Sequence, residues 1–235
     1  MIALKPPVHV LYADPTNRWS RNGQSVEYIV LHYVGAVSTA KANAVYLNRD
    51  ANLGWSAHFF TDETGVWQSV PLDESAGHCG VDYSGGRAPF WGKCRCKNSV
   101  GIEMCCKQDA AGKWYIEPET VRNTVRLVRW LMAEYGVDTD HVVRHYDVCR
   151  KTCPEPWVRD PAQWQAFLEQ LKEEEPMIRF NTVAELPAHY RSETEKLIRR
   201  GALRGRADGA LDVSEDMLRT MLVCQRMVDE REEPA

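Results

Sequence analysis

The sequence lacks any long apolar segment and any excess of positive charge. Its longest apolar runs are short, such as residues 28–31, whereas a membrane-spanning helix needs roughly 20 predominantly apolar residues. The formal net charge is −4, and no segment carries the basic footprint of a nucleic-acid-binding protein. The sequence therefore predicts no membrane span and no nucleic-acid partner.

The amino-terminal residues also lack the features of a secretory signal peptide. Residues 1–7 contain one lysine followed by two prolines, without the apolar core of about 7–15 residues that such a signal requires. We therefore expect the protein to be made in the cytoplasm. Because disulfides are rare there, the cysteines are expected to be mostly reduced thiols, one of them a metal ligand. They are Cys79, Cys94, Cys96, Cys105, Cys106, Cys149, Cys153 and Cys224.

What is present is an ordinary globular composition, with strand and helix signals that alternate. The 235 residues, 44% hydrophobic and 26% charged, suffice for a real core. Strands are predicted at 27–34 (closed by Gly35), 56–61, 66–70, 100–105 and 142–145. Helices are predicted at 39–50 (capped by Ser38), 119–135 and 164–171, and residues 77–96 form a long loop. The alternation predicts an α/β fold with a central mixed β-sheet flanked by helices.

A charged segment that ends in proline, 172–176, is the predicted linker between two domains. Residues 1–171 form the larger domain in this interpretation, and residues 177–235 form a small helical domain. Its helices are predicted at about 188–200, ended by Gly201, and at about 215–228, capped by Ser214. A unit of this size has only a marginal core by itself.

Three metal-binding side chains can meet at one edge of the predicted sheet. His32 lies near the end of a predicted strand, and His145 and Cys153 lie in a turn that follows another strand. Zn²⁺ favours tetrahedral coordination by nitrogen and sulfur, and three protein ligands leave a place for water, as in catalytic zinc sites. Because such spacing also arises by coincidence, the prediction depends on the surrounding motifs.

Four motifs in consistent order surround these residues. They are Ile-Val-Leu-His-Tyr-Val-Gly at 29–35, Ser-Ala-His-Phe at 56–59, Asn-Ser-Val-Gly-Ile-Glu-Met at 98–104, and His-Tyr-Asp at 145–147 followed by Lys-Thr-Cys-Pro at 151–154. Over about residues 25–157 the chain resembles the zinc N-acetylmuramoyl-L-alanine amidases, which include bacteriophage endolysins and are related in fold to the peptidoglycan recognition proteins. The resemblance implies that same mixed sheet flanked by helices, with a groove over one zinc ion.

Position by position, the resemblance implies roles for five residues. The zinc ligands would be His32, His145 and Cys153. Glu103 would be the general base near the attacking water, and Lys151 would stabilise the oxyanion that develops on the scissile carbonyl. Some family members carry a tyrosine where this chain has Ala57. That difference favours the mechanism assisted by Glu103 over the one that depends on the tyrosine.

Other histidines and aromatic residues offer further candidates. His78, in the long loop, and Trp91, among glycines in the same loop, are predicted to contact the substrate, although simple loop packing is an alternative for His78. Trp55 and Trp67 are expected in the core. His58 alternates with apolar neighbours on a strand, so we expect a hydrogen-bonded core histidine rather than a fourth ligand.

Cys94 and Cys96, combined with Cys105 and Cys106, offer a second zinc site. The single residue between Cys94 and Cys96 is short for a structural site, in which two to four residues usually separate the ligands. Free or core thiols are therefore the favoured interpretation.

The small carboxy-terminal unit carries one motif, from Thr194 to the helix after Ser214, that is weakly similar to a single S-layer-homology repeat. This similarity implies attachment to the cell wall, and a stabilising helical hairpin is the alternative. A lone copy of a repeat also favours self-association into a homo-oligomer. Met177 directly follows the linker, and we hypothesise that it starts a second, shorter chain.

The sequence thus predicts an endolysin-type hydrolase that cleaves the amide bond between N-acetylmuramic acid and L-alanine in peptidoglycan. Without a signal peptide, such an enzyme would act on the wall after membrane permeabilisation. Two alternatives remain at this point: a peptidoglycan-binding receptor without activity, and a zinc peptidase that cuts within the stem peptide.

Overall fold

The computed structural model describes residues 5–81, 83, 85–173, 179–186, 188–214, 217, 218, 220 and 221. The chain divides into two compact units, residues 1–173 and 174–235, and each is described by itself. Most of the predicted linker, Met177 and Cys224 lie outside the described residues. No helix in the described ranges is long and apolar enough to cross a membrane.

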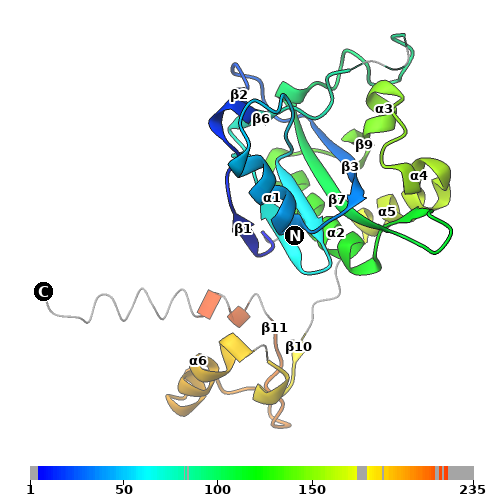
Figure 1. Cartoon of the computed structure of the whole chain (residues 1–235). Coiled ribbons are helices and arrows are strands. Elements are labelled where there is room, and N and C mark those ends of the chain that lie inside the picture. The colour runs from blue at the N-terminus through cyan, green and yellow to red at the C-terminus, as the bar shows by residue number, and fades with distance from the viewer. Residues whose placement is uncertain are drawn as a thin grey trace, which may run out of the picture. The chain divides into compact units, whose positions relative to one another are not determined.

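The first unit is built on a mixed seven-stranded sheet (Figure 1), as predicted. Its strands follow the order β1-β5-β4-β7-β3-β9, with β8 paired to β7. They are β1 (Val8–Val10), β3 (Tyr28–Val37), β4 (Phe59–Asp62), β5 (Gly65–Gln68), β7 (Ser99–Gln108), β8 (Trp114–Tyr115) and β9 (Val142–Arg144). The central strands β4, β7, β3 and β9 run parallel to one another, whereas β5 runs antiparallel to β4 and β8 antiparallel to β7. A separate antiparallel pair joins β2 (Arg18–Ser20) to β6 (Glu74–Ala76).

Helices cover both faces of this sheet (Figure 1). They are α1 (Ala40–Arg49), α2 (Pro118–Tyr135), α3 (His145–Cys149), α4 (Glu155–Arg159) and α5 (Pro161–Lys172). Successive residues of a strand point to opposite faces. Phe59 accordingly packs in the cluster that contains the apolar residues of α2 and α5, whereas Phe60 packs with Ala40 and Leu47 of α1. The sheet therefore lies between α1 on one face and a layer formed by α2 and α5 on the other.

Three predicted boundaries need correction. The side chain of Thr39, not Ser38, caps α1, by accepting a hydrogen bond from the backbone N–H of Ala42 at 3.1 Å. Gly35 does not end β3, because its left-handed φ of +67° accommodates an irregularity in the pairing with β7, and the strand continues to Val37. His145 does not end a strand but begins α3.

The second unit contains a short antiparallel pair, β10 (Arg179–Phe180) with β11 (Val213–Ser214), and the helix α6 (Ala188–Arg199). Leu186, Tyr190, Leu211, Val213 and Leu218 form its buried apolar cluster. The first predicted helix is therefore present, with Gly201 just beyond its end. Most of the second, at 215–228, lies outside the described residues.

Candidate metal centre

The register of three adjacent strands brings His32, Glu103 and His145 together. His32 on β3 is paired directly with Glu103 on β7. On the other side of β3, Leu31 is paired with Arg144, the last residue of β9, so that His145 follows at the level of His32. Paired residues of parallel strands point to the same face of a sheet. The two histidines and the carboxylate therefore share one face, opposite α2.

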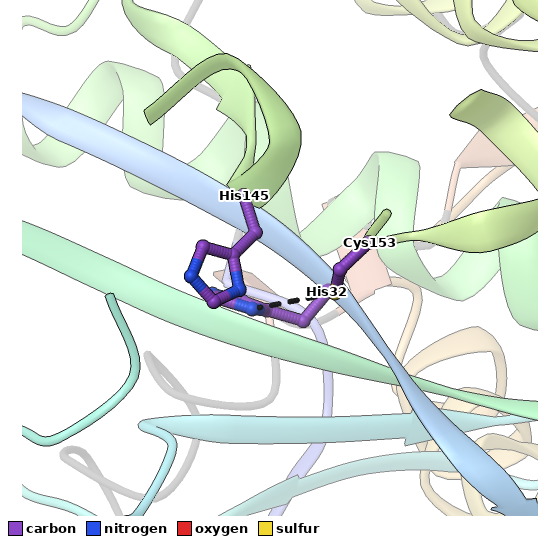
Figure 2. A group of neighbouring side chains, drawn as sticks. All are labelled: His32, His145 and Cys153. Carbon is purple, nitrogen blue, oxygen red and sulfur yellow. Dashed lines mark hydrogen bonds between the residues drawn. The ribbon is translucent and has the colours of Figure 1, made fainter. Parts of the chain in front are cut away.

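Cys153 completes a group of three buried donors (Figure 2). One donor atom from each of His32, His145 and Cys153 lies within 4.8 Å of the others. The Cys153 Sγ is 3.7 Å from Nδ1 of His32, and the centroids of the two imidazole rings are 4.5 Å apart. The three side chains that the sequence singles out as ligands therefore converge, although they come from distant parts of the chain.

Local hydrogen bonds fix the turn that carries His145 and Cys153. The carboxylate of Asp147 accepts hydrogen bonds from the backbone N–H of Arg144, at 3.0 Å, and from its guanidinium, at 2.9 Å, which shapes the start of α3. The backbone N–H of Tyr146 donates to the carbonyl of Cys153 at 2.9 Å. Asp147, part of a motif noted in the sequence, thus supports the position of His145.

Several polar atoms of this group have no hydrogen-bond partner among the described residues. Both ring nitrogens of His145 and the Oε2 atom of Glu103 are buried without such a partner. Leaving such a group unsatisfied costs about 1–3 kcal/mol, so native proteins rarely retain one without a reason. Two imidazoles and one thiol beside a carboxylate are a donor set suited to a divalent cation. The residues present therefore fit a metal ion.

His78 lies against His32 and fixes the orientation of its ring. Nε2 of His32 is 3.1 Å from Nδ1 of His78, and Nε2 of His78 is 3.2 Å from Oγ of Ser99. The Ser99 hydroxyl donates to the carbonyl of Arg95 at 2.6 Å, so the protons in this chain run from His32 to His78 to Ser99. In that arrangement Nδ1 of His32 keeps its lone pair directed toward Cys153. Gly101 makes room for the His78 ring, since a Cβ there would lie 2.5 Å from Cγ of His78.

Burial dominates the electrostatics of the group. It lowers the pKa of His32 well below the usual 6.5 and that of His145 to about 4, with the positive charge of Lys151 contributing to both. Both rings are therefore neutral near pH 7 and able to donate lone pairs. Burial also raises the pKa of Glu103 to about 8, against the opposing effect of Lys151, and raises the pKa of the Cys153 thiol.

The group opens onto a cleft with a volume of about 620 Å³. His78, His145 and Lys151 line it, as do the aromatic side chains Trp19, Trp55 and Tyr83. Trp91, the aromatic residue predicted to contact the substrate, is half-buried and is not among the residues that line the cleft. The sequence pattern did not single out Trp19 or Tyr83, because nothing in their spacing distinguishes them from core aromatic residues.

His58 is a buried histidine with hydrogen-bonded ring nitrogens, as expected, and it is not part of the donor group. Its Nδ1 accepts a hydrogen bond from the backbone N–H of Gly101 at 3.0 Å, and its Nε2 donates to the carbonyl of Glu74 at 3.1 Å. Burial, together with the nearby Arg21 guanidinium, lowers the pKa of His58 from 6.5 to about 3.

This shift predicts a loss of stability in acid. Between about pH 6.5 and pH 3 the unfolded chain binds a proton at His58 that the folded protein does not. The free energy of unfolding therefore falls with decreasing pH in this window, by up to about 1.4 kcal/mol per pH unit. His58→Gln, whose amide can keep both hydrogen bonds without titrating, is expected to reduce this slope in urea unfolding experiments. An unchanged slope would contradict the assignment.

The four cysteines considered for a second zinc site do not lie together, in agreement with the favoured interpretation of free or core thiols. Cys105 packs near α1 and Cys106 contacts the carbonyl of Ala36 at 3.8 Å, whereas Cys94 and Cys96 lie beside Cys79. A second site made of Cys94 and Cys96 with Cys105 and Cys106 is therefore wrong. Cys105 and Cys106 lie on a strand of the central sheet, away from the loop that carries the other two.

The fold and the donor group define an α/β protein with a candidate three-ligand metal centre in a cleft. The sequence profile of the N-acetylmuramoyl-L-alanine amidase family, Amidase_2, matches residues 22–156. The chain belongs to this family.

Known proteins of this kind align with about two thirds of the chain. A probable N-acetylmuramoyl-L-alanine amidase of Bacillus licheniformis is 34% identical over 163 residues, which are 66% of this chain and 44% of that protein. The chain thus spans less than half the length of this relative. A mutant endolysin from Bacillus subtilis shares the fold at 25% identity, with a TM-score of 0.55, over 70% of this chain and 98% of that one. The catalytic domain of XlyA is 23% identical, with a TM-score of 0.54, and the match covers 70% of this chain and 99% of that one. At this identity the likeness supports the fold alone.

Proposed function

We propose that this protein hydrolyses the amide bond between N-acetylmuramic acid and L-alanine in peptidoglycan, with a zinc ion held by His32, His145 and Cys153. The observation that carries the proposal is the convergence of these three buried donors beside Glu103, at a cleft, in a member of this family. Relatives named as amidases support the choice of substrate bond.

The donor set favours zinc among divalent ions. Imidazole and thiolate ligands suit Zn²⁺, whereas Mg²⁺ and Ca²⁺ prefer oxygen ligands. When bound, zinc supplies a Lewis acid that polarises the scissile carbonyl and makes water more acidic. A cation would also favour the ionised form of the Cys153 thiol, offsetting the burial that raises its pKa.

We assign the role of general base to Glu103. Its Oε1 lies 4.0 Å from Nδ1 of His32, on the side where Cys153 lies, and its Oε2 has no partner among the described residues. A carboxylate held in this way accepts a proton from the attacking water and can pass it to the departing amide nitrogen. Its elevated pKa makes it a stronger base than an exposed carboxylate.

Lys151 supplies positive charge at the rim of the site. Its side chain lines the cleft together with His145, two residues before Cys153. An ammonium in this position stabilises the negative charge that develops on the carbonyl oxygen during attack. The exposed rings of Trp19 and Trp55 offer flat surfaces on which a sugar ring can stack, so we assign that role to them rather than to Trp91.

Because His32 donates a hydrogen bond to His78, we expect Gly101→Ala to weaken zinc binding strongly. The added Cβ would force the His78 ring away and release the His32 ring. Loss of such a supporting bond typically lowers metal affinity about 10–100-fold. We expect the zinc concentration that restores half of the activity of the chelator-treated protein to rise by this factor.

Gly80→Ala is the matched control, because a Cβ at Gly80 meets nothing within 4 Å and lies in the same loop as His78. It should leave that zinc concentration unchanged. Equal behaviour of the two variants would argue against a positioning role for His78.

The proposed activity is tested by digesting purified cell walls and identifying the new termini by mass spectrometry. Wild type is expected to release stem peptides with free L-alanine amino termini, and Glu103→Ala and Cys153→Ser are expected to release none. New termini within the stem peptide would indicate a peptidase instead. Binding to walls without any new terminus would indicate a receptor.

For the small unit, residues 177–235, we propose attachment to the cell wall or self-association. Either role would suit an endolysin-type enzyme that reaches the wall after membrane permeabilisation. Sedimentation of the full chain measures self-association, and cosedimentation of Glu103→Ala with purified walls measures attachment.

The short chain proposed to start at Met177 would be visible as a second band after expression. Replacement of Met177 by leucine should remove that band.

A further inference from the structure

Three exposed aromatic side chains form a row that begins in the cleft and continues beyond it. Trp19 on β2 and Trp55 in the segment between α1 and β4 line the cleft, whereas Tyr46 on α1 lies outside its lining. The exposed fractions of Trp19, Trp55 and Tyr46 are 38%, 37% and 38%. Large aromatic residues are usually buried, so an exposed group of them points to a ligand.

The row is held in place by contacts with the backbone. The ring centroids of Tyr46 and Trp55 are 6.1 Å apart, with the ring planes inclined by 33°. A Cβ on Gly77 would lie 2.8 Å from Cζ3 of Trp19 and 3.3 Å from Cα of Trp55, so both residues pack against this glycine. The backbone N–H of Ser56 donates to the carbonyl of Gly77 at 3.1 Å, and its hydroxyl accepts from the N–H of Gly77 at 3.1 Å. The three rings therefore form a platform that exists before a ligand binds.

The platform is too small for a stable protein interface. Three aromatic side chains exposed to this degree present on the order of 200–300 Å². Each partner in a stable protein complex contributes about 800 Å². A short row of rings suits instead a chain-like ligand whose units contact one ring after another.

The neighbouring side chains favour a carbohydrate as this ligand. Ser20 and Asn22 line the cleft close to Trp19 in the chain and offer neutral hydrogen-bonding groups. A sugar ring has an apolar face that can lie on an aromatic ring, and its hydroxyl and acetamido groups can bond to such neutral side chains.

The proposed substrate is a polymer, and the cleft holds only part of it. A pocket of about 620 Å³ accommodates a ligand of drug size. The sugar backbone of peptidoglycan continues beyond the unit that carries the scissile amide, so the neighbouring sugars must lie outside the cleft. Tyr46 extends the row in which Trp19 and Trp55 line the cleft.

We propose that Trp19, Trp55 and Tyr46 form an extended binding site for the polysaccharide backbone of the substrate, in which Tyr46 contacts sugars beyond the unit that is cleaved. This inference rests on the proposed function. A contact remote from the reacting amide is the same in the ground state and the transition state, so it lowers KM without changing kcat. A substrate short enough to end within the cleft cannot use it.

Tyr46→Ala tests this proposal with two substrates, long soluble strands of peptidoglycan and the single disaccharide-peptide unit that a glycosidase releases from them. KM for the long strands is expected to rise about fivefold, the usual cost of losing one aromatic anchor. The value of kcat and the KM for the single unit should stay unchanged. Alanine at this half-exposed helix position favours the helix, so the fold should be kept.

Tyr115→Ala is the matched control, because Tyr115 is also 38% exposed but lies on β8, outside the row. It should keep the wild-type KM for both substrates. The proposal is overturned if Tyr46→Ala keeps the wild-type KM for the long strands, or if its KM rises equally for both substrates.

Two further variants identify the kind of contact. Tyr46→Phe keeps the flat ring and should keep the wild-type KM for the long strands, whereas Tyr46→Leu is apolar without a flat face and should behave like Tyr46→Ala. A leucine variant with wild-type KM would contradict the proposal and indicate a general apolar contact, as with a protein partner or a second copy of the chain.

Failure of the proposed function is seen separately, as the absence of amide cleavage in both substrates by wild type. The binding site is still tested in that case by calorimetry with glycan strands stripped of their peptides. Tyr46→Ala should bind these strands about fivefold more weakly than wild type. Equal affinities, or no binding by wild type, would contradict the proposal.

Discussion

Replacing Cys153 with serine is expected to lower kcat/KM for cell-wall hydrolysis at least about 1,000-fold, which corresponds to roughly 4 kcal/mol of lost transition-state stabilisation. Serine nearly preserves the volume of the side chain, but its hydroxyl does not ionise near neutral pH and is a poor zinc ligand. The neighbouring donors, His32 and His145, would remain in place. The loss should therefore reflect the missing thiolate rather than a collapsed fold.

The measurement is the rate of release of stem peptides from purified walls, with zinc content determined on the same sample. Circular dichroism would verify that the variant is folded. Cys105→Ser removes another buried thiol, one outside the donor group, and should retain wild-type activity. Activity of Cys153→Ser within tenfold of wild type would exclude Cys153 as a required ligand.

Replacing Glu103 with glutamine is expected to have the second large effect, a fall in kcat. The amide has nearly the same shape as the carboxylate but cannot accept the proton of the attacking water. General-base catalysis contributes typically 10²–10⁴-fold, so kcat should fall by about this factor. Zinc content and KM should change little, because Glu103 is not one of the three ligands. A variant with wild-type kcat would remove Glu103 from the mechanism.

The pH profile gives an independent measure of the same residue. Glu103 must be ionised to act as a base, so wild-type activity should rise with increasing pH through its pKa. Burial raises that pKa to about 8, and a cation bound beside it would lower it, which places the rise at or below about pH 8. Glu103→Gln should lose this rise and retain a flat residual rate.

The sequence predicted that His32, His145 and Cys153 would meet at one centre, because they and Glu103 lie in strong local patterns. The apolar run around His32 and the one around Glu103 each predict a buried strand, and the family resemblance implies their roles. The pairing of His32 with Glu103 is a property of strand register, which local patterns do not determine. The structure was needed to place them side by side.

Features that depend on contacts across the fold were not predictable. His78 was expected at the substrate, yet its ring bonds to His32 and Ser99 as well as lining the cleft, because Gly101 lacks a side chain opposite it. Likewise, the contact of Cys79 with Cys96 had no signal in the sequence, because it depends on how the loop folds back on itself. Distances along the chain carry little information about which residues a long irregular loop brings together.

The central claim is tested most directly by anomalous X-ray scattering from a crystal of the zinc-loaded protein, measured at the zinc absorption edge. The account predicts a strong anomalous peak between Nδ1 of His32, a ring nitrogen of His145 and Sγ of Cys153, at distances near 2.0–2.3 Å. Electron density without an anomalous peak among these three side chains would contradict it.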